Sequence, residues 1–183
     1  MPHPIVEQLR FTRSEWLRGL DGVSEDDATV HLGPNPMNSI GWIVGHLTWQ
    51  EQRYLLHRSQ GLMPFPGIQE RFAFEAPMST PSLRETLDAW RAITAAADPF
   101  LDRLTRADLE RDLPLDGKAS GQSLGSAIRR LTYHYWFHVG EVQAVRQLLG
   151  QRDLPATSRS RPPTGLRPEP PREPDARPSF ALR

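Results

Sequence analysis

Three histidines have the residue type and the spacing of a metal site. His134 and His138 lie four residues apart in LTYHYWFHVGEV, and His46 lies far upstream in GWIVGHLTWQ. Residues four apart project from one face of a helix, so the two imidazoles of the pair would point the same way. Three neutral imidazoles can hold Zn²⁺, Ni²⁺, iron or Mn²⁺ and leave a coordination position open for water or substrate.

The pair shares its register with apolar residues. The stripe has alternating spacings of four and three and consists of Ala127, Leu131, His134, His138, Glu141, Val145 and Leu148. Burying an imidazole costs free energy unless its nitrogens find partners. These partners are either one shared metal ion or protein groups in the core or at an interface. A shared ion requires His46 to lie about 3 to 3.5 Å from the other two reactive nitrogens, and a separation above about 6 Å would exclude it.

Three further polar residues are candidates for roles around this site. Glu141 lies one turn beyond His138, where it either orients the imidazole or forms a salt bridge with a neighbouring helix. Arg53 and Arg130 lie within about two turns of the histidines and either bind a thiol or substrate carboxylate or are ordinary solvated arginines. No catalytic base is assigned from the sequence.

The elements that must position these residues are helical. Apolar residues at helical spacing predict four long helices, at about 4–20, from about 38, from 80–82 and from about 123. The connection between the second and third is too long for a tight turn, so these two helices can run parallel through a crossover. The sequence therefore predicts an all-α four-helix bundle over residues 1–152.

Composition narrows the class of protein. The chain has 22 basic and 22 acidic residues, so it lacks the broad positive field that binds nucleic acid. It has no cysteine and no apolar stretch long enough for a membrane span, which indicates a cytoplasmic protein. Residues 153–183 are rich in arginine and proline, with few large apolar side chains, and we expect a disordered tail there.

Two stretches resemble the DinB-like superfamily. They are GLDGVSEDDATVHLGPNPMNSIGWIVGHLTWQEQRYLL and the later LTYHYWFHVGEVQAVRQLLG. The resemblance extends from the first helix to Gly150 and implies an up-down-down-up bundle in which three histidines bind a divalent metal. The matching residues are His46, His134 and His138.

The resemblance also implies a function, because the superfamily includes mycothiol- and bacillithiol-dependent transferases. We expect a metal-dependent S-transferase that joins a low-molecular-weight thiol to a small electrophile. The chain uses arginine almost to the exclusion of lysine, which hints at the GC-rich coding of an actinobacterial host and so favours mycothiol over bacillithiol. The same residues are compatible with a metal-dependent hydrolase, a non-catalytic metal- or ligand-binding stress-response bundle, or a purely structural bundle. Relatives are often dimers, so a homodimer is expected.

Overall fold

The computed structural model describes residues 2–33 and 37–155, and this part of the chain is helical. In order, the helices are α1 (Pro4–Gly19), α2 (Glu25–Ala28), α3 (Ile40–Glu51), the π-helical turn η1 (Gln52–His57), α4 (Arg58–Gln60), α5 (Ile68–Phe72), α6 (Leu83–Leu101), α7 (Arg106–Glu110) and α8 (Leu124–Leu148). Only isolated β-bridges accompany them in the described residues. The prediction of an all-α fold is confirmed.

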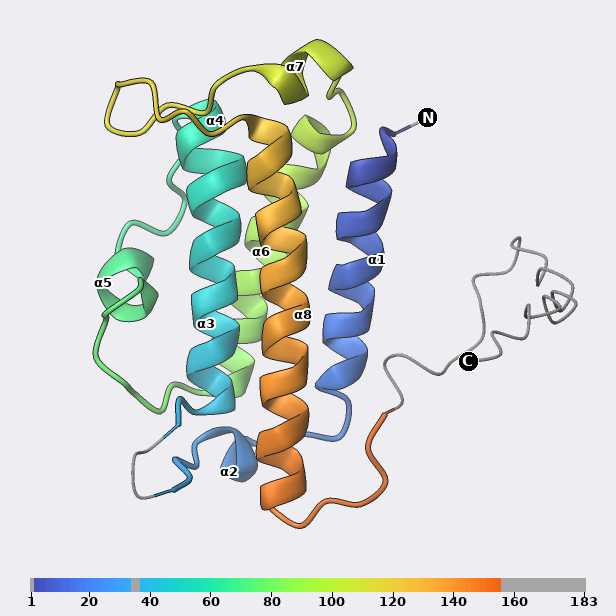
Figure 1. The fold of residues 1–183 in the computed structure, drawn as a ribbon. Coiled ribbons are helices and arrows are strands. Elements are labelled where there is room, and N and C mark those ends of the chain that lie inside the picture. Colours follow the sequence, from blue (N-terminus) through green and yellow to red (C-terminus); the bar gives the residue numbers. More distant parts are fainter. Residues whose placement is uncertain (1, 34–36, 156–183) are drawn as a thin grey trace, which may run out of the picture.

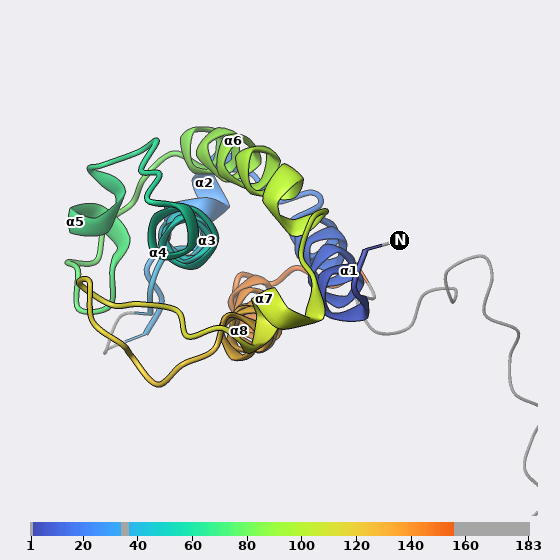
Figure 2. The ribbon, with the colours of Figure 1, turned by 90° about the horizontal axis from the view of Figure 1, so that it is seen from above.

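The long helices form a ring around one core. Seen from above, α1, α6, α3 and α8 surround the centre, and α3, η1 and α4 continue one another without a break (Figure 2). The helix α3 packs on α6 and on α8, while α1 packs on α8. In Figure 1, α3 and α6 run upward and α1 and α8 run downward, which is the arrangement that the expected crossover produces.

Serine side chains cap the N-termini of three of the four long helices, α3, α6 and α8. Ser39, Ser82 and Ser123 each accept a hydrogen bond from the backbone N–H three residues on, which is the usual N-cap contact. The second long helix thus begins at Ile40, two residues after the predicted start. At α6, the backbone N–H groups following Ser82 are also bound by the Glu25 carboxylate of α2.

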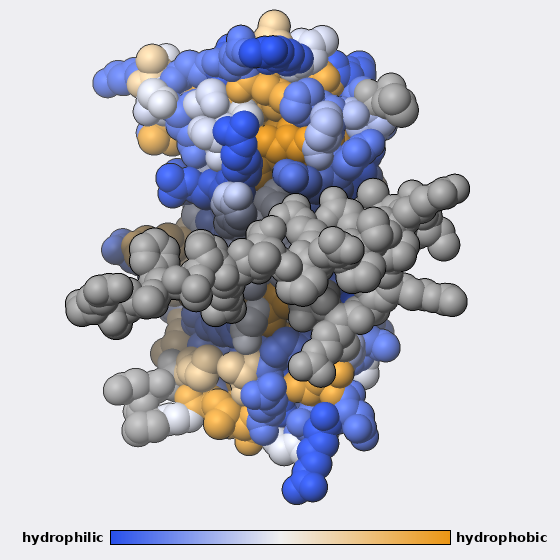
Figure 3. Space-filling view, turned by 45° about the vertical axis from the view of Figure 1, so that its right-hand side comes forward, coloured by the Kyte–Doolittle hydropathy of each residue, from blue (hydrophilic) through white to orange (hydrophobic). Residues whose placement is uncertain are grey.

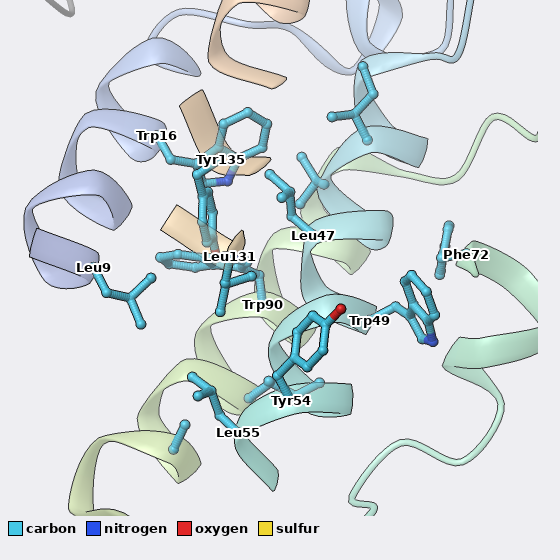
Figure 4. Close-up of a cluster of buried hydrophobic side chains, with 14 of the residues drawn as sticks. Leu9, Trp16, Leu47, Trp49, Tyr54, Leu55, Phe72, Trp90, Leu131 and Tyr135 are labelled. Atoms are coloured by element: carbon cyan, nitrogen blue, oxygen red, sulfur yellow. Dashed lines mark hydrogen bonds between the residues drawn. The ribbon is translucent and has the colours of Figure 1, made fainter. Parts of the chain in front are cut away.

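A buried polar network ties the four long helices together. Arg13 of α1 donates to both carboxylate oxygens of Glu51 at 2.8 and 2.7 Å. Glu51 also accepts from the Tyr135 hydroxyl at 2.8 Å, and that hydroxyl accepts from the Trp90 indole at 2.6 Å. Figure 4 shows Tyr135 and Trp90 within the surrounding apolar side chains. This network fixes how the helices are rotated about their axes.

The connection between α4 and α6 carries α5 along the outer side of α3 (Figure 1). The Gln52 side chain pins it, donating to the Phe65 carbonyl at 3.0 Å and accepting from the Phe65 N–H at 2.9 Å. Phe72 is buried, whereas Phe65 and Phe74 are exposed. Of these three phenylalanines, Phe72 is the one that packs on the hydrophobic core.

The connection between α6 and α8 contains the short helix α7 and a tight turn. Leu115 and Lys118 exchange two backbone hydrogen bonds of 2.9 Å across Asp116 and Gly117. Both turn residues have positive φ, 50° and 73°, as a two-residue hairpin turn requires. An Asp-Gly pair is a frequent sequence signal for such a turn.

The molecular surface around α1 and α8 is mixed. On the uncovered parts of the face in Figure 3, hydrophobic residues form separate patches among hydrophilic ones. The homodimer stays a prediction.

Within the described ranges no helix has the length and apolar character to cross a membrane. The predicted tail of residues 153–183 lies outside the described residues from position 156 onward.

Candidate metal centre

His46, His134 and His138 lie together between α3 and α8, and we call them the histidine cluster. One ligand atom of each lies within 4.8 Å of the ligand atoms of the other two. The Nε2 atoms of His134 and His138 are 3.0 Å apart. The distances from His46 stay below the 6 Å at which a shared ion would be excluded.

Two of the imidazoles are oriented by acceptors on their outer nitrogens. The Nδ1 of His46 lies 2.7 Å from the carbonyl oxygen of Phe72 in α5. The Nδ1 of His138 lies 2.6 Å from a carboxylate oxygen of Glu141. Since a carbonyl and a carboxylate only accept, both Nδ1 atoms carry the hydrogen, and the neutral rings present the lone pair of Nε2. This is the orientation that protein metal sites impose on their histidine ligands.

His134 completes the argument for a cation. Its Nε2 faces that of His138, and its Nδ1 is buried with no hydrogen-bond partner among the described residues. Two lone pairs repel at 3.0 Å unless one nitrogen carries a hydrogen or a cation lies near both. A divalent cation is the one group that satisfies all three Nε2 atoms at once, so the three histidines fit a metal ion.

Burial keeps two imidazoles of the cluster, those of His46 and His134, in the neutral form. Burial lowers the pKa of His134 to about 3, with a further contribution from the neighbouring His138. Burial also lowers the pKa of His46 to about 4, against the opposing effect of the hydrogen bond that His46 donates to the Phe72 carbonyl. Both imidazoles are therefore uncharged at pH 7, and their lone pairs are free to bind metal.

Aromatic rings form the wall of the site on the α3 side. The Trp42 ring stacks on His46 with centroids 5.0 Å apart, and Trp49 lies against the same imidazole at 5.3 Å. The α5 segment closes this side through Phe72, which lies opposite Trp49 in Figure 4. On the α8 side, His134 is partly exposed and so gives the cluster its access to solvent.

The buried stripe of α8 differs from the prediction. Leu148 is 66% exposed, whereas Tyr135 is completely buried. The cause is that α8 packs on both α1 and α3, so its core face centres on Leu131, Tyr135 and Val142. His134 and His138 lie at the edge of that face, where they contact His46 of α3 and do not point into the centre of the bundle.

Among the described residues, no hydrogen bond, ion pair or ring contact joins Arg53 or Arg130 to the histidine cluster, although the charge of Arg130 contributes to the lowered pKa of His134. Both instead line a pocket beside η1 and the start of α8. Glu141, in contrast, makes the contact that the sequence allowed, with its carboxylate on His138 instead of on an arginine of another helix.

Two groups were missed by the reasoning from sequence. The first is the Phe72 carbonyl, since a backbone acceptor leaves no signal in the residue type. The second is Glu51, which lies in the core beside Arg13. Its position five residues after His46 indicated that it faces elsewhere, and only a partner on another helix could show where.

Comparison with known proteins places the chain in a family and supports the fold. The family model of the DinB superfamily matches residues 8–142, so this chain belongs to the DinB superfamily. A crystal structure of a conserved protein from Enterococcus faecalis has a similar fold, with a TM-score of 0.60 and 14% sequence identity, covering 80% of this chain and 96% of that one. No curated protein matches the sequence.

Proposed function

We propose that this DinB-superfamily protein is a metal-dependent S-transferase that joins an external thiol to a small electrophile. The observation that carries the proposal is the convergence of three imidazoles, two of which have their outer nitrogens committed to the Phe72 carbonyl and the Glu141 carboxylate. Three such ligands leave a divalent ion with an open position, as catalytic sites require.

The chemistry follows from what the chain contains and lacks. When bound, a divalent ion supplies a Lewis acid that lowers the pKa of a thiol at its open position. The thiol must come from outside, because the chain has no cysteine. In the transfer, the thiol proton passes to solvent, the sulfur forms a bond to the electrophilic atom, and the leaving group departs with its electron pair.

The surroundings favour a thiol over water as the nucleophile. Within the described residues, Glu141 is the carboxylate found in contact with the histidine cluster, and it accepts the hydrogen of His138. It is therefore engaged in orienting a ligand and is poorly placed to remove a proton from water. A thiol, with an unperturbed pKa of about 8.5 against about 15.7 for water, loses its proton with less help from the protein.

The experiment is turnover of an electrophile panel with mycothiol, bacillithiol or no thiol, before and after treatment with a chelator. We expect turnover that needs both thiol and metal. Thiol-independent, metal-dependent hydrolysis would replace the proposal with a hydrolase. Stoichiometric metal without turnover of any substrate would instead indicate a non-catalytic binding protein.

A further inference from the structure

Three arginines, Arg53, Arg58 and Arg130, line one pocket near the histidine cluster. The pocket has a volume of about 430 Å³ and lies where η1, the loop before α8 and the first turns of α8 meet. Its polar lining consists of Arg53, Arg58, Ser120, Gln122, Ser126 and Arg130. No acidic side chain is part of the lining, so the pocket carries a concentrated positive charge.

Two of these arginines keep their hydrogen-bond donors available. The guanidinium of Arg53 lies over the rings of Trp49 and Tyr54, at 5.2 and 5.6 Å from their centroids. These contacts orient the group without using its N–H donors. Arg130 is exposed, and no described residue forms a hydrogen bond or an ion pair with it. Both side chains can therefore bind an incoming oxyanion.

The third arginine, Arg58, holds the loop that forms one wall of the pocket. Arg58 donates to the carbonyls of Leu113 and Pro114 at 2.6 and 2.9 Å and to the Gln122 side chain at 3.0 Å. It thus fixes the loop that closes the pocket. Burial and the neighbouring charge of Arg53 lower the pKa of Arg58, which reflects the crowding of positive charge there.

The nearby acids do not neutralise the two available arginines. The Asp112 carboxylate accepts from the N–H groups of Ser120 and Gly121 at 3.0 and 2.7 Å, so it is used to shape the loop. Asp116 lies in the hairpin turn, and its charge acts on Arg58. Neither acid forms an ion pair with an arginine of the pocket in the described structure.

The pocket is within reach of the histidine cluster. Arg130 lies one helical turn before His134, about 6 Å along the axis of α8. Arg53 lies seven residues after His46, about 10 Å along the continuous helix formed by α3 and η1. The Trp49 ring contacts both of these side chains. A small molecule a few bonds long can therefore span from the cluster to the pocket.

We propose that this arginine pocket binds an anionic group, such as a carboxylate, of a ligand whose other end reaches the metal held by the histidine cluster. The inference rests on the proposed function and narrows it to anionic ligands. Arg53 and Arg130 hold the oxyanion through paired N–H donors, and Arg58 holds the loop that completes the pocket.

The test compares two thiols that differ only in charge, 6-mercaptohexanoate and 6-mercaptohexan-1-ol. Their binding to the cobalt-loaded protein is followed by the thiolate-to-cobalt absorption band. We expect the carboxylate to bind about tenfold or more tightly than the alcohol, as one charge-assisted contact of about 1.4 kcal/mol provides. Equal affinities in the wild-type protein would overturn the proposal.

Variants locate the preference. Replacing Arg53 and Arg130 by Gln together should reduce the affinity ratio to about one while the alcohol binds as before, and Arg130→Gln alone, at an exposed position, should give part of the loss. The matched control is Arg129→Gln, an exposed arginine of α8 outside the pocket, which should keep the full ratio. A ratio that survives the double substitution, or that Arg129→Gln reduces equally, would refute the site.

A thiol-free measurement separates this proposal from the proposed function. Hexanoate titrated into ¹⁵N-labelled protein should shift the side-chain Nε–H signals of Arg53 and Arg130, with or without metal. Such shifts without any thiolate band would support the pocket while contradicting the S-transferase. Unchanged arginine signals at saturating hexanoate would contradict the pocket, whatever the thiols do.

Discussion

Removing the Glu141 carboxylate should weaken metal binding without unfolding the protein. Glu141 accepts from His138 at 2.6 Å, and the two side chains are 19% and 6% exposed. A hydrogen bond to a charged group contributes about 1.5 to 3 kcal/mol, and the partial exposure of Glu141 places the expected effect near the lower part of that range. At 1.4 kcal/mol for each factor of ten, Glu141→Ala should raise the dissociation constant for zinc by about 10- to 30-fold.

The assay is competition for zinc against a chromophoric chelator at pH 7.5. Glu141→Gln, which keeps an acceptor but loses the charge, should fall between Glu141→Ala and the wild type. The matched control is Glu110→Ala on α7, because Glu110 is exposed and, within the part of the chain that the structure describes, pairs with Arg106 alone. If Glu141→Ala changes zinc affinity by less than about threefold, the carboxylate does not orient a ligand and the reasoning on the tautomers is wrong.

Three further predictions concern stability and packing. Glu51→Gln leaves the buried Arg13 guanidinium without its bidentate partner, so urea unfolding should show a loss of about 3 to 5 kcal/mol, and a loss below 1 kcal/mol would contradict the role given to this pair. Gly45→Ala places a Cβ 2.5 Å from the Phe72 ring and should lower both stability and zinc affinity, whereas Gly140→Ala, which meets nothing within 4 Å, should do neither. In the metal-free folded protein, the pKa values of His46 and His134 are about 4 and about 3, below the ordinary 6.5, so the unfolded chain binds protons at a higher pH than the folded one. The free energy of unfolding should therefore fall as the pH drops from about 6.5 towards 4. Urea unfolding that gives an equal or larger free energy of unfolding at pH 5 than at pH 7.5 would contradict this.

The sequence carried enough information to predict the all-α fold and the meeting of His46 with the His134 and His138 pair. Helical periodicity is a local property, so the helices follow from the sequence alone. The shared direction of His134 and His138 also follows from it, because residues four apart project from one face of a helix. Bringing His46 to the pair depended on the resemblance to the superfamily, since nothing local to GWIVGHLTWQ identifies a ligand.

The remaining features depend on contacts between distant segments. The Phe72 carbonyl reaches His46 because the connection folds back along α3, and no residue type announces a backbone acceptor. The partnership of Glu51 with Arg13 and Tyr135 depends on how three helices are rotated against one another. The π-helical turn at Gln52–His57 likewise has no signature in the apolar pattern.

The most direct test of the central claim is the zinc content of the untagged protein after dialysis against zinc and then against metal-free buffer. The wild type should retain one ion per chain by mass spectrometry. His46→Ala should retain almost none while its circular dichroism stays helical, because the apolar faces of the long helices hold the fold. A wild type without metal, or a His46→Ala protein that keeps stoichiometric zinc, would contradict the three-histidine site and the function built on it.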